Sequence, residues 1–142
     1  MPTELSVHAV HRGGMRIDAA AGEHALEMDY PMPGGDGACA GLTPLQVLLA
    51  GLAGCSGNTL ALVLGRMQQP VEAIEVDARG RRRDEHPTVL TDIALEFVVR
   101  GRGVDPAAVG RALAMAEEQL CPVWAMLKPG VAISAAFTVV ED

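Results

Sequence analysis

Aromatic residues are scarce in this chain of 142 residues, where Phe, Tyr and Trp together make up 3%. Because stacking on aromatic rings is how many proteins hold unpaired bases, a base-stacking surface is not expected. An excess of positive charge is also lacking, since the formal net charge is −7. An acidic chain is repelled by phosphate backbones and by anionic lipid headgroups. Neither nucleic acid nor a membrane is therefore expected as a partner.

Cysteine is sparse too, with three residues, which is few for a fold held by disulfides. The histidines and cysteines match no zinc-ligand spacing, and no phosphate-binding glycine motif or Ser-His-Asp pattern is present. No metal ion or other cofactor is therefore expected. Residues 1–16 lack the apolar run of a signal peptide. Together these absences favour the cytoplasm, where thiols stay reduced or are used for chemistry.

Charge is missing altogether from residues 38–65. A run of that length could span a bilayer. Polar residues are scattered through it, however, and the rest of the chain has an ordinary amphipathic pattern; the interrupting residues are Pro44, Gln46, Ser56, Asn58 and Thr59. The pattern therefore favours a helix at the centre of a soluble assembly over a transmembrane helix. The one basic run, residues 79–83, precedes Asp84 and Glu85, which favours a solvated hairpin end over a polyanion site.

Hydrophobic periodicity and turn residues predict nine elements in the order β-β-β-α-β-β-α-α-β. The expected strands are residues 5–11, 16–19, 24–28, 71–83, 89–99 and 131–140, and the expected helices are residues 43–69, 105–120 and 121–127. Strands grouped in hairpins indicate an α+β fold with antiparallel sheets, in one domain over residues 1–142. The first helix is too long for so small a chain to bury on all sides, so a partner chain is expected to cover it.

Cys55 lies in the first predicted helix among three glycines, at positions 51, 54 and 57. Each glycine inside a helix lowers helix stability by about 1 kcal/mol relative to alanine. Three of them in one segment therefore indicate that another group comes close to the helix backbone there. Either another backbone packs there around an inert thiol, or a ligand reaches a reactive one. Both interpretations remain open from this segment.

Cys121 immediately precedes Pro122, which places its sulfur at the start of a helix. Free N–H groups and the helix dipole there favour a thiolate, so the pKa of Cys121 is expected to be lowered. The alternative is a small apolar residue packed under Trp124. If Cys121 meets Cys55, the pair can cycle between a sulfenic acid and a disulfide, and an external dithiol must then restore both thiols. Cys39, in a glycine-rich loop, is expected to be exposed and incidental.

Two cysteine-containing motifs together resemble the OsmC/Ohr family. The first is the stretch from Thr43 and Pro44 through Cys55 to Asn58, and the second is the stretch around Cys121 and Pro122; residues 67–76 and 85–89 extend the match. The resemblance covers nearly the whole chain, and the predicted order of elements is also the family's. It implies an OsmC-like fold in an intertwined homodimer, with antiparallel sheets wrapped around long central helices.

The resemblance also implies roles for particular residues. Cys55 would attack the peroxide and Cys121 would resolve the product, while an arginine would steady the thiolate. Arg16 is the preferred match for that arginine, with Arg12 as the alternative. The sequence departs from the peroxidase branch at Leu45, where the branch has a glutamate that pairs with the arginine.

The sequence thus predicts a thiol-dependent peroxidase that reduces organic hydroperoxides, or hydrogen peroxide, in oxidative stress defence. Its expected partners are a second copy of the chain, a small hydroperoxide and an external dithiol reductant. Two alternatives remain. One is a non-enzymatic module that binds a hydrophobic ligand, and the other is a sulfur carrier with a persulfide on Cys121.

Overall fold

A computed structural model describes residues 3–141. Its contacts divide the chain into two compact units, with the boundary between Leu48 and Leu49 inside the first helix. Each unit is described below by itself. The prediction of a single domain over residues 1–142 stays a prediction.

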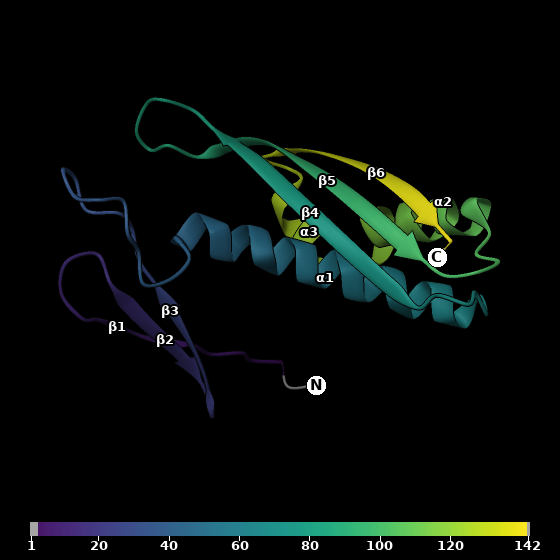
Figure 1. Ribbon diagram of the computed structural model, residues 1–142, viewed down its shortest axis with the longest axis horizontal. Helices are drawn as coiled ribbons and strands as arrows, with labels where there is room; N and C mark the ends of the chain where they lie inside the picture. Colours follow the sequence, from purple (N-terminus) through teal and green to yellow (C-terminus); the bar gives the residue numbers. More distant parts are fainter. Residues whose placement is uncertain (1–2, 142) are drawn as a thin grey trace. The chain divides into compact units, whose positions relative to one another are not determined.

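The N-terminal unit contains a small antiparallel sheet in the order β1-β2-β3 (Figure 1). Its strands are β1 (His8–His11), β2 (Ile17–Ala21) and β3 (His24–Met28). All three lie within or overlap the predicted strands, although β1 begins at His8 and not at residue 5. A glycine-rich loop follows β3, and the buried carboxylate of Asp29 braces it by accepting hydrogen bonds from the backbone N–H groups of Tyr30 and Ala40.

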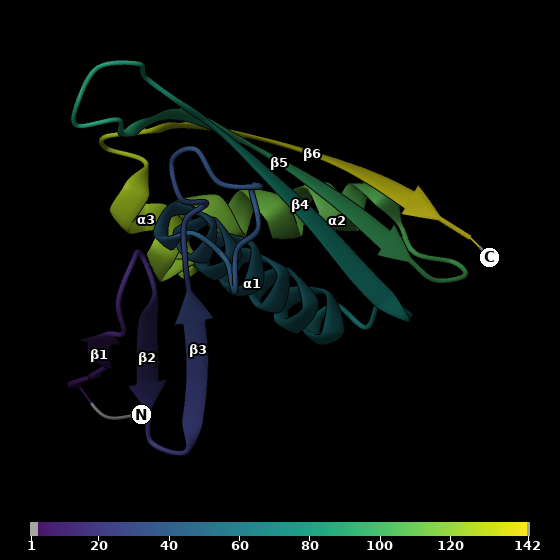
Figure 2. The ribbon, with the colours of Figure 1, turned by 60° about the vertical axis from the view of Figure 1, so that its left-hand side comes forward.

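The second unit is built on the sheet β4-β5-β6, with helices on one face (Figures 1 and 2). The strands are β4 (Ala73–Arg82), β5 (Leu90–Arg100) and β6 (Ala132–Val140). The helices are α1 (Pro44–Arg66), which begins in the N-terminal unit, α2 (Pro106–Met115) and α3 (Pro122–Leu127). Pro44, Pro106 and Pro122 each open a helix, as the missing N–H of proline allows. The α+β class and the element order are confirmed.

The core of this unit lies between the sheet and the helices. Alternate residues of β5 are at most 1% exposed and point to the helices: Ile93, Leu95, Phe97 and Val99. Leu52, Leu60 and Leu64 of α1 are fully buried. Small residues permit close packing at the edges, because Gly57 of α1 lies against Val76 of β4, and Gly110 of α2 lies against Phe137 of β6. The thiol-bearing helices are therefore fixed on one rigid sheet.

Two details differ from the sequence prediction. Strand β6 pairs with β5 in parallel, not antiparallel, because the crossover through α2 and α3 returns the chain to the end of the sheet where β5 began. The helix predicted over residues 105–120 is regular only to Met115. A π-helical turn, η1 (Ala116–Leu120), then carries the chain to Cys121.

Helix α1 has 23 residues and a mean hydropathy of 1.8 over its most apolar window, so its length and composition alone would allow a membrane span. A core helix of a soluble protein passes the same test. The described residues bury 28% of that window. Within residues 3–141, most residues of that window thus keep some exposure to solvent.

Candidate active site

The candidate site begins with the start of α1, which a reciprocal pair of hydrogen bonds defines. The backbone N–H of Gln46 donates to Thr43 Oγ1 at 3.2 Å, and the backbone N–H of Thr43 donates to Gln46 Oε1 at 2.9 Å. This capping box satisfies two N–H groups that a helix start otherwise leaves unpaired. Leu45, where the peroxidase branch carries a glutamate, takes no part in it. The side-chain amide of Gln46 accepts its hydrogen bond from the backbone of the same helix start.

Cys55 lies near the middle of α1 and is half-buried. One turn later, Thr59 Oγ1 donates a hydrogen bond to the carbonyl oxygen of Cys55 at 2.8 Å. The neighbouring glycines differ in their surroundings, because Gly57 packs against β4 while a Cβ at Gly54 would meet no atom. Close packing against the Val76 side chain therefore explains Gly57, but not Gly54.

Cys121 stands between η1 and α3, where it is the N-cap residue with extended backbone angles (φ −82°, ψ 108°). Its backbone N–H closes the π-helical turn by donating to the carbonyl oxygen of Ala116 at 2.9 Å. Its side chain is 1% exposed. The wider π turn and the extended cap together set the direction in which this thiol leaves the helix.

The structure brings Cys55 and Cys121 close enough for one thiol to affect the pKa of the other, although they are far apart in the sequence. Burial raises the pKa of Cys121 above its ordinary value, and the neighbouring Cys55 raises it further. Backbone N–H groups of Trp124 and Val123 donate to the sulfur and act in the opposite direction, but more weakly. The expected lowering of this pKa is therefore wrong, because desolvation of the thiolate outweighs the helix-start donors.

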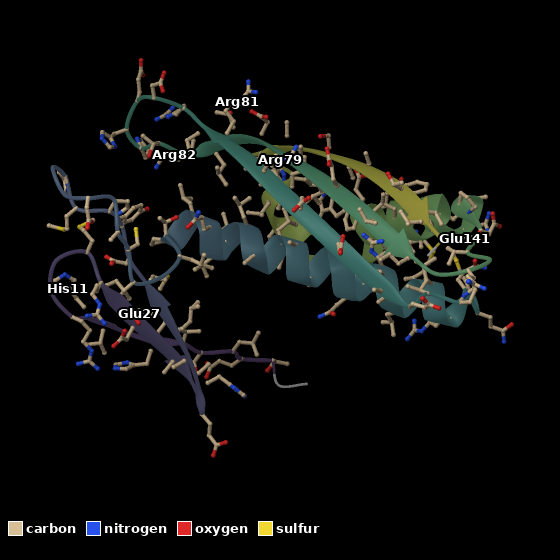
Figure 3. The ribbon with its side chains drawn as sticks, viewed as in Figure 1. His11, Glu27, Arg79, Arg81, Arg82 and Glu141 are labelled. Carbon is tan, nitrogen blue, oxygen red and sulfur yellow. The ribbon has the colours of Figure 1, made fainter. Side chains whose placement is uncertain are left out.

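The two candidate arginines lie in the N-terminal unit, and each pairs with a carboxylate there. Arg16 donates to Glu27 of β3 at 2.5 Å, and Arg12 donates to Asp18 of β2 at 3.0 Å (Figure 3). All four side chains are about half exposed. Sequence analysis missed Glu27 as the partner of Arg16. The register of the β2–β3 hairpin explains the pair, because Ile17 pairs with Met28 and residues 16 and 27 therefore lie diagonally opposite each other.

The third cysteine, Cys39, is exposed as predicted, and its sulfur is 3.9 Å from the carbonyl oxygen of Gly37. Within residues 3–141, no three His, Cys, Asp or Glu side chains gather closely enough to hold a metal ion. The basic run on β4 is solvent-exposed, with Arg79, Arg81 and Arg82 visible along the strand (Figure 3). Arg83 donates to three carbonyl oxygens of the turn that follows, so it acts as a brace for that turn.

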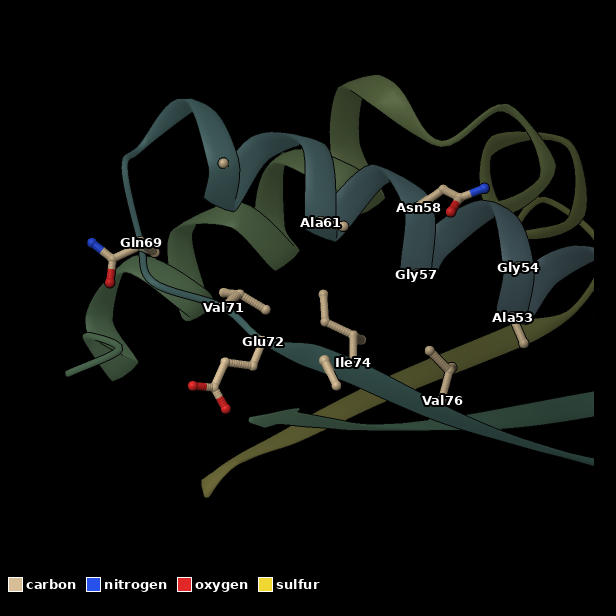
Figure 4. Close-up of a pocket in the computed structure, with 12 residues that line it drawn as sticks. Ala53, Gly54, Gly57, Asn58, Ala61, Gln69, Val71, Glu72, Ile74 and Val76 are labelled. Atoms are coloured by element: carbon tan, nitrogen blue, oxygen red, sulfur yellow. The ribbon is translucent and has the colours of Figure 1, made fainter. Parts of the chain in front are cut away.

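A groove of about 570 Å³ lies between α1 and the segment that leads into β4 (Figure 4). Small residues of α1 form one wall, including Gly54, Gly57 and Ala61. Val71, Ile74 and Val76 form the other wall, and Glu72 and Gln69 lie at one end. Neither cysteine of the pair lines it. The groove is thus a second concave surface, separate from the thiols.

Comparisons with known proteins agree on one family. A family model described as OsmC-like protein matches residues 34–136. Protein YhfA of Escherichia coli is 36% identical over 98 residues, which cover 69% of this chain and 73% of YhfA.

Solved structures share the fold. An OsmC-like protein from Mycoplasma pneumoniae superposes with a TM-score of 0.85 at 19% identity, over 99% of both chains. The organic hydroperoxide resistance protein OhrB of Bacillus subtilis superposes with a TM-score of 0.66 at 24% identity, over 95% of this chain and 98% of OhrB.

Proposed function

The chain belongs to the OsmC-like protein family, and from that premise we propose that it is a cysteine-based peroxidase that reduces organic hydroperoxides. The observation that carries the proposal is the proximity of Cys55 and Cys121, two thiols from separate helices. Two neighbouring thiols are what a cycle between a sulfenic acid and a disulfide requires. The OhrB relative, named for organic hydroperoxide resistance, supports the same class of substrate.

The different burial of the two thiols supports different roles for them. Cys55 is half-buried, so a peroxide can reach it, whereas Cys121 is 1% exposed. The raised pKa of Cys121 keeps this thiol protonated near neutral pH. Cys55 is therefore the attacking residue, and Cys121 is the resolving residue, which needs to meet only its neighbour.

The cycle has three steps. The Cys55 thiolate attacks the outer oxygen of the hydroperoxide, an S–O bond forms, the O–O bond breaks, and the alkoxide leaves and takes a proton to become the alcohol. Cys121 sulfur then attacks the sulfenic sulfur of Cys55, so that a disulfide forms and the oxygen leaves as water. An external dithiol reduces the disulfide and is itself oxidised. This chemistry suits the reducing cytoplasm.

An arginine near the Cys55 thiolate would favour ionisation and donate hydrogen bonds to the peroxide. We assign this role to Arg16. Its ion pair with Glu27 supports the assignment, because the carboxylate holds the guanidinium in one direction. Glu27 thus takes the part that a carboxylate on α1 plays in the peroxidase branch, where this chain has Leu45.

The test is hydroperoxide turnover in three variants with dithiothreitol as the reductant. Cys55→Ser is expected to reduce consumption of cumene hydroperoxide to the uncatalysed level. Cys121→Ser is expected to form a sulfenic acid that dimedone traps, but no intramolecular disulfide. Cys39→Ser, the matched control, should keep full turnover and show a Cys55–Cys121 disulfide by mass spectrometry. Full turnover in Cys55→Ser would remove the proposal.

A second candidate function, the binding of a hydrophobic ligand, is favoured by the groove between α1 and β4. Its walls include the apolar side chains of Val71, Ile74 and Val76, and its volume suits a small molecule. If this is the function, extraction of the purified protein yields a bound ligand, and Gly54→Leu, which fills open space in the groove, abolishes binding. The third alternative, a persulfide carrier on Cys121, is disfavoured because a carrier thiol must be reached by a partner and Cys121 is buried.

A further inference from the structure

The π-helical turn before Cys121 leaves the carbonyl oxygen of Glu117 without its helical donors. In a regular α-helix the backbone N–H of residue 121 donates to the carbonyl oxygen of residue 117. Here the Cys121 N–H donates to Ala116 instead, at 2.9 Å. The π-helical donor for Glu117 would be residue 122, five positions on, and Pro122 has no N–H. Backbone groups alone therefore do not complete this turn.

The side chain of Lys128 supplies the missing donor. Its Nζ donates a hydrogen bond to the carbonyl oxygen of Glu117 at 3.3 Å. Lys128 is the C-cap residue of α3. The bond therefore joins the end of α3 to the turn that precedes its start, and Cys121 lies inside the loop that this bond closes. The ammonium group suits the task, because it is a compact donor on a flexible stem.

The hydrogen-bond register of the turn decides the direction of the Cys121 thiol. If the Cys121 N–H donated to Glu117, residues 116–121 would continue α2 as an α-helix. The residues that follow would then be turned about the helix axis by about 100°, the rotation of one residue. An α-helix is the ordinary state of such a segment, and π-helical turns are rare. The bond from Lys128 occupies the Glu117 oxygen and so favours the π-helical register.

We propose that Lys128 is a positioning residue for the resolving step: its ammonium group holds residues 116–121 in the π-helical register and so directs the Cys121 sulfur toward Cys55. The inference rests on the proposed peroxidase function. In that step the Cys121 sulfur attacks the sulfenic sulfur, the S–S bond forms and the S–O bond breaks. The hydroxyl group of the sulfenic acid takes the thiol proton and leaves as water. Lys128 takes part in none of these bond changes and acts only through the direction of the attacking sulfur.

One NMR experiment reads the register directly and needs no peroxide. Scalar coupling across a hydrogen bond links an amide nitrogen to the carbonyl carbon of its acceptor, so it identifies the acceptor of the Cys121 N–H in ¹³C,¹⁵N-labelled protein. The native protein is expected to show coupling to Ala116. Lys128→Met, which keeps a stem but has no donor, should show coupling to Glu117, and Lys128→Arg, which restores a donor, should return it to Ala116. Coupling to Ala116 in Lys128→Met overturns the inference.

A kinetic experiment tests the consequence in a Cys39→Ser background. One equivalent of cumene hydroperoxide is added, dimedone traps the sulfenic acid on Cys55, and mass spectrometry follows the disulfide with time. Lys128→Met should form the sulfenic acid at the native rate but close the disulfide about tenfold more slowly, the effect of losing one hydrogen bond from a charged donor. A general loss of structure would slow both steps. Closure at the native rate contradicts the inference.

Two further variants are matched to Lys128→Met in the same assay. Lys128→Arg should recover most of the closure rate, because it restores a charged donor. Arg111→Met removes an exposed cation from α2 and should close at the native rate. A loss of closure in Arg111→Met equal to that in Lys128→Met would show that net charge, and not the bond to Glu117, is responsible, and would refute the inference.

The measurements separate this inference from the proposed function. If the native chain forms neither the sulfenic acid nor the disulfide, the peroxidase proposal fails and the role of Lys128 in resolution fails with it. If both species form but Lys128→Met keeps the native coupling and closure rate, the role of Lys128 alone is refuted. Urea unfolding is the folding control, since substitution of an exposed side chain is expected to change stability little.

Discussion

At the scale of single residues, Cys121 shows how two opposed effects are decided by magnitude. Its place at the start of α3 supplies backbone N–H donors, which lower the pKa of a thiol. Its burial removes water from the thiolate, which raises the pKa, and burial is the larger effect. At Cys121 the helix start is therefore not enough to lower the pKa of the thiol, because the sulfur is buried.

The raised pKa predicts a pH dependence of stability. Because the folded chain holds the Cys121 proton more tightly than the unfolded chain, the stabilisation is complete below the ordinary thiol pKa of 9.0 and is lost as the pH rises past it. The free energy of unfolding of the reduced protein should fall more steeply between about pH 8 and pH 10 than that of Cys121→Ala. Urea titrations with a reductant measure both slopes. Cys39→Ser, which lacks an exposed thiol, should keep the native slope, and equal slopes for all three proteins would refute the prediction.

At the scale of elements, the ends of α1 and α2 determine where chemistry is placed. Thr43 and Gln46 fix the start of α1, and the π-helical turn after α2 adds width to the helix just before Cys121. The cap formed by Thr43 and Gln46 can be expected from the sequence, because these residue types are typical of helix starts. The π-helical turn cannot, because residues 116–120 are ordinary helix formers.

The capping box predicts a non-additive pair of substitutions. Thr43→Ala should lower the free energy of unfolding by about 1 kcal/mol, since a backbone N–H of the first turn loses its acceptor. Gln46→Ala should cost less, because alanine is itself a strong helix former. The double variant should cost less than the sum of the two, as the side chains act on each other's backbone. Urea titrations of the four proteins provide the cycle, and strict additivity would show that the two bonds are independent.

At the scale of the whole molecule, the main question is what covers the apolar surface of α1. Helix α1 is uncharged up to Arg66 in its last turn, and with 28% of its apolar window buried by its own chain it needs further cover. We propose that a second copy supplies it in the homodimer expected for the family. Leu62 of α1, 55% exposed, would lie at that interface.

The homodimer prediction is tested by solution mass. Light scattering is expected to give twice the chain mass of 14.8 kDa for the native protein. Leu62→Arg should dissociate the dimer, because a charge buried in an apolar interface is strongly unfavourable. Val89→Arg, an exposed apolar position beside the β4–β5 turn, should leave the mass unchanged. A native protein that remains at one chain mass would contradict the homodimer and leave α1 uncovered.

Much of the fold follows from the sequence, because its signals are local. Alternation at residues 89–99, the prolines at 44, 106 and 122, and the glycine turns each act through neighbouring residues. They indicated the order of the helices and strands, but not the π-helical turn at residues 116–120. The pairing direction of β6 did not follow, since it depends on the path of the whole crossover rather than on any residue of the strand.

The candidate site divides in the same way. Sequence alone identified the two cysteines and their helices, because a helix start and a cluster of glycines are both patterns of neighbouring residues. Only the tertiary structure decided that the thiols lie close together, that burial reverses the expected pKa shift of Cys121, and that the side chain of Lys128 reaches the carbonyl oxygen of Glu117. Desolvation and contact are set by atoms from distant parts of the chain, and no short stretch of sequence contains them.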